Sequence, residues 1–148
     1  MNYSRCRNIF LYSSCFFLII TGFLKLVALL SGGTYLTQTD KLLQIENVYV
    51  LLGALICEWT VIILIFIKPQ SLWTELGLLF LGSQFVLYRT ISALGKFTTT
   101  CPCIGNMGKA LGLSPQTEGF ILSFIAAWLF ISGALLLWYK PFRSTPDH

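Results

Sequence analysis

This 148-residue sequence has almost no histidine and few charged residues. Its single histidine is His148, which excludes a catalytic triad, a haem held by histidine and a histidine proton relay inside the fold. Aspartate, glutamate, lysine and arginine make up only 11% of the residues, compared with about 25% in soluble domains, and 55% are hydrophobic. The composition therefore indicates a membrane protein in contact with the lipid bilayer.

Four continuous apolar runs account for most of the chain. Each is close to the roughly 20 residues that a helix needs to cross a bilayer. No repeat, linker or low-complexity tract separates them, so we predict one all-α domain over residues 1–148, a four-transmembrane-helix bundle. Ser114 as N-cap and Pro115 at the first helical position open the last span. The predicted spans are residues 9–31, 47–67, 72–92 and 119–139.

The basic residues near the span ends predict the orientation of the bundle. Five of them fall on one side and three on the other. By the positive-inside rule we expect both termini in the cytoplasm, a multi-pass protein of the bacterial inner (plasma) membrane, and a periplasmic loop over residues 93–118. Because the basic residues are divided between two faces, the net charge of +4 does not indicate nucleic-acid binding. The two groups are Arg5, Arg7, Lys68, Lys140 and Arg143, and Lys41, Lys96 and Lys109.

Three ionisable residues, Lys25, Glu58 and Arg89, interrupt three different spans. Such groups cost a few kcal/mol to insert, so they usually face the bundle interior and find a partner. At about 1.5 Å per helical residue, Arg89 lies about 5 Å below the outer end of its span, Lys25 about 9 Å and Glu58 about 16 Å. We therefore expect Lys25 to meet Glu58 in the outer half of the bundle, with Arg89 just above them.

Two interpretations of this trio stay open. In the first, Lys25 and Glu58 form a structural pair while Arg89 extends to the membrane interface. In the second, two cations against one carboxylate leave a positive site beneath residues 93–118. Such a site favours a cysteine thiolate, and it suits an anionic intermediate or a quinone oxygen.

Seven-residue spacings mark the faces of two spans. Gly82 shares a face with Glu75 and Arg89, which predicts an inward face on the third span. Glu75 itself is expected to be an interfacial charge close to Lys68. On the fourth span, the recurring small residues predict close helix packing in lipid. These small residues are Gly119, Ala126 and Gly133.

The polar stretch "TTTCPCIGNMG" contains Cys101 and Cys103, separated by Pro102. Their Cα atoms lie about 5.5–7 Å apart in an extended or turn conformation, near the upper limit for a disulfide. Pro102 restricts the backbone on both sides, so a ring can close only under strain. Strained, exposed disulfides are those that exchange, and so short a ring removes little chain entropy. Thiol–disulfide exchange is therefore the expected use of the pair.

Two alternatives use the same atoms. Two thiolates can hold Cu(I) or contribute to a zinc site. The loop has no further cysteine, aspartate or glutamate before Glu118 and the single histidine is His148, so zinc would lack ligands and no metal site is predicted. The pair can also be an ordinary tight turn. The other three cysteines are interpreted as small packing residues, and they are Cys6, Cys15 and Cys57.

Taken in order, "TGFLKL", "CEW", "YRTISALGKF" and "CPCIGNMG" resemble the methylamine-utilisation MauE family, within the wider DoxX-like group of four-span membrane proteins. The resemblance covers roughly residues 9–139. Ile104 and Pro102 depart from it, because the family often has phenylalanine and a small residue there. The residues that fit the family pattern are Gly22, Lys25, Glu58, Arg89, Cys101, Cys103 and Gly105.

The resemblance implies a membrane component of periplasmic redox maturation, as in the formation of disulfides in a methylamine dehydrogenase subunit. Cys101 and Cys103 are then the catalytic redox pair, and Lys25, Glu58 and Arg89 form the intramembrane polar cluster. The implied partner is a periplasmic thioredoxin-like protein, and a quinone is a candidate electron acceptor. The positions with expected structural roles are Gly22, Pro102, Gly105, Ser114 and Pro115.

Two further functions compete with this one. The first is a non-enzymatic scaffold or assembly subunit of a DoxX-like respiratory or sulfur-oxidation complex, in which the charged trio fixes the bundle. The second is a transporter that uses Lys25 and Glu58 as a substrate or proton site. A transporter is disfavoured because no broken helix is evident near the midplane. The sequence does not assign the client protein or the oligomeric state.

Overall fold

The computed structural model describes residues 3–32, 36–40, 42–94 and 114–138. These residues form four helices, α1 (Tyr3–Ser31), α2 (Asn47–Ile67), α3 (Leu72–Leu94) and α5 (Pro115–Trp138). They contain no β-strand, only an isolated bridge between Thr39 and Glu46. The prediction of an all-α fold is confirmed. By length and composition, α1, α2 and α5 are apolar enough to cross a membrane.

α2 has the predicted bounds, and the other three helices are longer than the predicted spans. α1 begins at Tyr3, before the apolar span predicted from residue 9, and α3 continues to Leu94. α5 begins at Pro115, the predicted first helical position, ahead of the apolar span from residue 119. Hydropathy marks the apolar part of a helix, whereas backbone hydrogen bonding continues through polar residues. At the start of α5 the predicted cap is present, because the Thr117 amide donates to Ser114 Oγ at 3.2 Å. The predicted loop 93–118 is therefore shorter at both ends.

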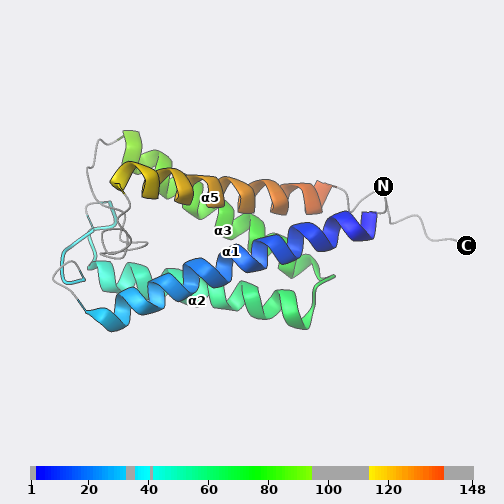
Figure 1. Cartoon of the computed structure of the whole chain (residues 1–148), viewed down its shortest axis with the longest axis horizontal. Coiled ribbons are helices and arrows are strands. Elements are labelled where there is room, and N and C mark those ends of the chain that lie inside the picture. The colour runs from blue at the N-terminus through cyan, green and yellow to red at the C-terminus, as the bar shows by residue number, and fades with distance from the viewer. Residues whose placement is uncertain (1–2, 33–35, 41, 95–113, 139–148) are drawn as a thin grey trace, which may run out of the picture.

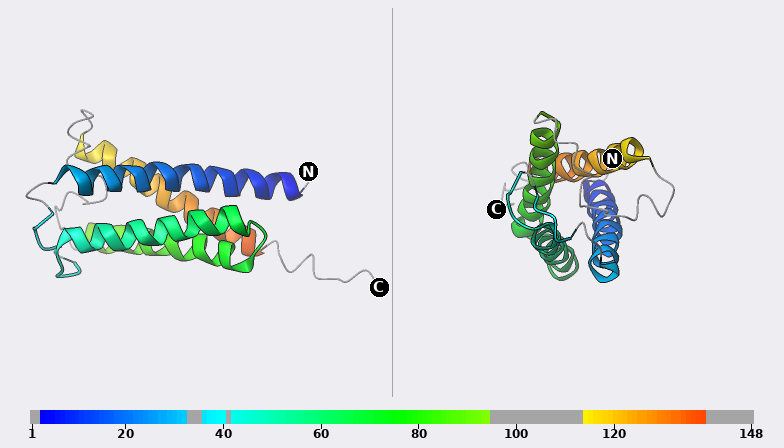
Figure 2. Two further views of the ribbon diagram at one scale, coloured as in Figure 1. Left: turned by 90° about the horizontal axis from the view of Figure 1, so that it is seen from below. Right: turned by 90° about the vertical axis from the view of Figure 1, so that its left-hand side faces the viewer.

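The four helices run roughly along one long axis (Figure 1). The turn between α2 and α3 lies at one end, together with the N-terminal end of α1. The segment between α1 and α2 lies at the other end, where α3 also finishes and α5 starts. We call this second end the loop end. Figure 2 shows α1 lying alongside α2, and α3 packs more closely against α5 than any other two helices pack.

Glycines allow α3 and α5 to touch backbone to backbone. A Cβ built on Gly82 would lie 2.4 Å from the Phe130 nitrogen, and one on Gly133 would lie 2.6 Å from the Leu79 nitrogen. Any side chain at either position would force the helices apart. Lipid tails are as apolar as leucine, so close van der Waals packing of this kind replaces the hydrophobic drive available in water. The close packing predicted from the spacing of small residues is confirmed.

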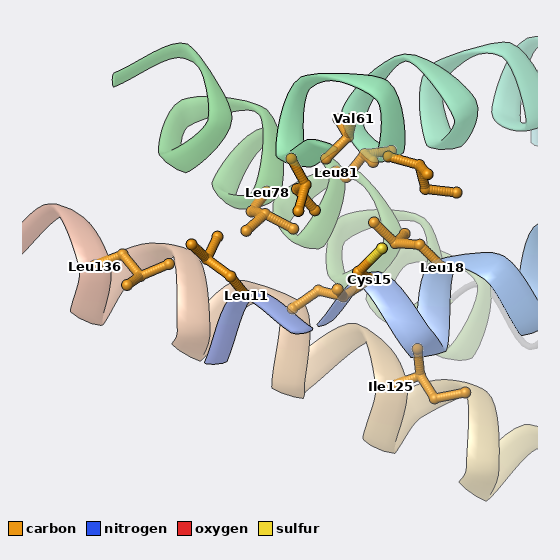
Figure 3. Packing of buried hydrophobic residues seen from close by; sticks show 11 residues of the cluster. Leu11, Cys15, Leu18, Val61, Leu78, Leu81, Ile125 and Leu136 are labelled. Carbon is orange, nitrogen blue, oxygen red and sulfur yellow. The ribbon is translucent and has the colours of Figure 1, made fainter. Parts of the chain in front are cut away.

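The centre of the bundle is an apolar cluster (Figure 3), and it encloses one small polar contact. Leu18, Leu78 and Leu129 are fully buried, and Cys15 packs among them at 4% exposure, as predicted. The hydroxyls of Ser14 on α1 and Ser132 on α5 lie 3.0 Å apart in this core. Cys6 is half-buried. Cys57 is exposed on α2 and does not pack inside the bundle, so the packing role predicted for it is wrong.

Candidate functional site: a buried charged cluster beside a small cavity

The site begins with an ion pair between α1 and α2. Lys25 Nζ lies 2.5 Å from Glu58 Oε1, and the two side chains are only 3% and 0% exposed. The Thr21 hydroxyl lies one turn before Lys25 and donates to the same oxygen at 3.1 Å. The contact between Lys25 and Glu58 predicted from their depths is therefore present. A buried charge needs such partners, because it has lost its hydration.

Gly22 provides room for the carboxylate against α1. A Cβ at this position would lie 3.5 Å from Glu58 Oε2 and 3.6 Å from Trp59 Nε1. These are ordinary contact distances, so Gly22 lies directly beside the second carboxylate oxygen, which is buried. Gly22, Lys25 and Glu58, which the sequence analysis selected together, thus come together in space.

α3 contributes an aromatic ring to the cluster. Lys25 Nζ lies 5.1 Å from the centroid of the Phe85 ring, within the range of a cation–π contact. Phe85 stands one helical turn before Arg89, so both point to the same side of α3. The ring therefore contacts the Lys25 ammonium group and stabilises it in an apolar setting.

Arg89 does not join the ion pair. Its Nη2 donates to the backbone oxygen of Gly119 at 2.6 Å, which connects α3 to the first turns of α5. A Cβ on Gly119 would lie 3.4 Å from that nitrogen, so the small residue allows the close approach. Among the described residues, Lys25 is the ionic partner of Glu58. Arg89 thus carries a charge that no described carboxylate neutralises.

A cavity of about 30 Å³ lies where the four helices meet at the cluster. Its polar lining is Thr21, Lys25, Glu58, Tyr88 and Arg89, and α5 contributes apolar side chains to it. A space of this size holds one or two water molecules, whereas benzene occupies a cavity of about 150 Å³. The cavity as it stands is therefore too small for a quinone ring.

Asp40 and Tyr88 connect the segment between α1 and α2 to this cavity. The Tyr88 hydroxyl, which belongs to a cavity-lining side chain, donates to Asp40 Oδ2 at 2.6 Å. Asp40 Oδ1 accepts from the amides of Leu42 and Leu43 at 2.8 and 2.9 Å. Burial raises the pKa of Asp40, but these hydrogen bonds outweigh it and leave the pKa below its ordinary value. The aspartate is therefore an ionised anchor for the segment.

Four residues of this region were not assigned to the site from the sequence. Thr21 and Phe85 each stand four residues before a selected charge, and that spacing on one helix face is a usable signal. Asp40 and Tyr88 are 48 positions apart, and no sequence pattern connects them. Only the fold brings the second pair together.

The burial of Glu75 contradicts another expectation. Glu75 was predicted to be an interfacial charge near Lys68, but it is only 2% exposed, and the Lys68 side chain is exposed. The neighbouring Thr74 is fully buried and donates to the Lys68 backbone oxygen at 2.8 Å. The turn between α2 and α3 thus folds over the start of α3, so position along a span did not predict burial.

The predicted redox pair lies outside the described residues. Cys101, Pro102, Cys103 and Gly105 all belong to the stretch 95–113. Ser114 and Pro115, in contrast, start α5 as expected. Within the part of the chain that the structure describes, no three histidine, cysteine, aspartate or glutamate side chains gather as metal ligands would.

Comparison of the chain with protein-family models, with curated proteins and with solved structures finds no match. The arrangement of Lys25, Glu58 and Arg89 at the loop end is therefore the basis on which a function is proposed.

Proposed function

We propose that this protein is a multi-pass inner-membrane component of periplasmic thiol–disulfide exchange. Cys101 and Cys103 cycle between dithiol and disulfide with a periplasmic thioredoxin-like protein, and the charged cluster of Lys25, Glu58 and Arg89 promotes the exchange. The resemblance to the MauE family supports this proposal. By the same resemblance, we propose that the client proteins are of the methylamine-dehydrogenase type and form their disulfides through this exchange.

One observation carries the proposal, namely the hydrogen bond from Arg89 to Gly119. Arg89 stands five residues before Leu94, where α3 ends, and Gly119 stands five residues after Ser114. At about 1.5 Å per residue, the guanidinium group is roughly 7 Å along each helix from the two points where residues 95–113 attach. The segment with both cysteines is thus tethered on either side of a cation that no described carboxylate neutralises.

The cation matters because the thiolate is the attacking species in exchange. A neighbouring positive charge favours the thiolate over the thiol. Lys25 is neutralised by Glu58, so Arg89 supplies the excess charge. A quinone acceptor is larger than the cavity of about 30 Å³, so we place any quinone elsewhere on the bundle.

The proposed topology has four crossings with both termini in the cytoplasm. α3 has 23 residues, or about 34 Å of helix, which exceeds the roughly 30 Å hydrocarbon core. Its charges, Glu75 and Arg89, lie toward its two ends, and the residues between them are uncharged. The distribution of basic residues then puts the loop end on the periplasmic side.

The relay is tested with the variants Cys101→Ser and Cys103→Ser. The redox state of periplasmic client proteins is measured by acid trapping and alkylation. Each variant is expected to leave clients reduced, whereas Cys57→Ser, at an exposed cysteine on α2, is the matched control and leaves them oxidised. Normal client disulfides in both cysteine-pair variants would overturn the relay.

A scaffold function is the second candidate, and the burial of the ion pair favours it. Lys25 and Glu58 are so enclosed that they serve to fix α1 against α2. On this alternative, a Cys101→Ala, Cys103→Ala double variant still assembles with its partner, and Glu58→Ala does not. Co-purification of the partner from membranes distinguishes the two functions.

A further inference from the structure

Two atoms in the charged cluster have no hydrogen-bond partner among the described residues. They are Oε2 of Glu58 and Nε of Arg89, and both are buried. Oε1 of Glu58 accepts from Lys25 and Thr21, and Nη2 of Arg89 donates to the backbone oxygen of Gly119. Glu58 is 0% exposed, so bulk solvent does not reach its free oxygen.

Both residues line the same cavity of about 30 Å³. A buried polar atom without a partner carries its full desolvation cost, and most buried polar atoms in native proteins have a partner. The carboxylate oxygen needs a donor, and the guanidinium Nε–H needs an acceptor. The molecule that fits must therefore be very small and must both donate and accept hydrogen bonds.

We propose that this cavity is a water-binding site, in which one or two water molecules donate to Glu58 Oε2 and accept from Arg89 Nε. The volume suits that number of waters, and the site offers the two or more polar partners that a buried water requires. A small anion would satisfy Arg89 but would face the free carboxylate oxygen, so water fits the site better.

Bound water adds a hydrogen-bonded link and an exchangeable proton to the cluster. It connects a carboxylate held by α1 and α2 to a guanidinium held by α3 and α5, and so links the two helix pairs through hydrogen bonds. It also puts an exchangeable proton next to the buried Glu58 carboxylate. The inference concerns the site of the proposed function but needs no redox step, so it can fail or hold independently of Cys101 and Cys103.

The direct test observes the water at Arg89. Protein containing ¹⁵N-arginine is placed in lipid nanodiscs, and magnetisation transfer from water to the Nε–H protons is recorded. A direct Overhauser contact is expected at the Arg89 resonance, which is assigned by its loss in Arg89→Lys. No contact between water and that proton would overturn the proposal.

The second test fills the cavity from α5. Ala126 lines it and is 3% exposed, while Ala127 next to it does not belong to the lining. Ala126→Val displaces water with methyl groups and is expected to lower the melting temperature by several degrees. Ala126→Thr has the same shape and offers a hydroxyl, so it is expected to recover part of that loss. Ala127→Val is the control for the change in helix propensity.

Two outcomes of the cavity-filling test would count against a hydrated site. A dry cavity gains from filling, so a higher melting temperature for Ala126→Val would overturn the proposal. Equal losses in Ala126→Val and Ala126→Thr, beyond the loss in Ala127→Val, would indicate steric crowding and no role for a hydrogen bond. Altered client oxidation with a normal water contact would bear only on the relay.

Discussion

Replacing Lys25 by methionine tests the ion pair at the centre of the candidate site. Methionine keeps an unbranched side chain in the apolar space beside Phe85 but removes the charge. Glu58 would then keep the Thr21 hydroxyl as its hydrogen-bond donor, with the carboxylate 0% exposed. A buried carboxylate without its cation should strongly destabilise the fold.

The size of the effect follows from the geometry. Unit charges 2.5 Å apart attract each other by about 7 kcal/mol at an effective dielectric constant of about 20. Much of this attraction offsets the cost of burying the two groups. Removing one partner of a buried pair therefore lowers the free energy of unfolding by about 3–5 kcal/mol, whereas replacing both by apolar residues is roughly neutral or stabilising. We expect Lys25→Met to show the loss and Lys25→Met, Glu58→Met to recover it.

The assay is reversible unfolding in mixed micelles followed by tryptophan fluorescence. Lys68→Met is the matched control, because the Lys68 side chain is exposed at the end of α2, and a change within about 0.5 kcal/mol is expected. The reasoning would be refuted if Lys25→Met cost less than about 1 kcal/mol, or if the double variant lost the sum of both single losses.

Two further predictions concern the helix contact and the segment between α1 and α2. Gly82→Ala must push α3 away from Phe130 and should lower the free energy of unfolding by about 1–3 kcal/mol. A Cβ at Gly53 meets nothing within 4 Å, so Gly53→Ala is the control and should not lower it. Equal stability of the two variants would contradict the close contact between α3 and α5. Because the hydrogen bonds to Asp40 outweigh burial and lower its pKa, their stabilisation is complete above about pH 4 and is lost as the pH falls through the lowered value. As the pH is lowered from 6 to 2, the unfolding midpoint of the wild type should therefore approach that of Asp40→Asn, and to a smaller extent that of Tyr88→Phe. A difference between wild type and variant that does not change with pH would show that Asp40 does not contribute in this way.

Composition and spacing alone predicted much of the fold. Continuous apolar runs predicted the helices, since only a helix satisfies every backbone hydrogen bond of an isolated apolar segment in lipid. The depths of Lys25 and Glu58 predicted their contact, because helical rise converts sequence position into height. The seven-residue spacing of Gly119, Ala126 and Gly133 predicted a close helix contact. All three inferences use a regular geometry that one helix carries by itself.

The tertiary structure decided what lies opposite each of those positions. Height along a helix does not specify which neighbour faces a side chain, so Arg89 was placed above the ion pair but its bond to Gly119 was not foreseen. The same limit applies to Asp40 and Tyr88, and to the burial of Glu75. Such contacts depend on how the four helices rotate and cross, and backbone approach at Gly82 fixes that crossing.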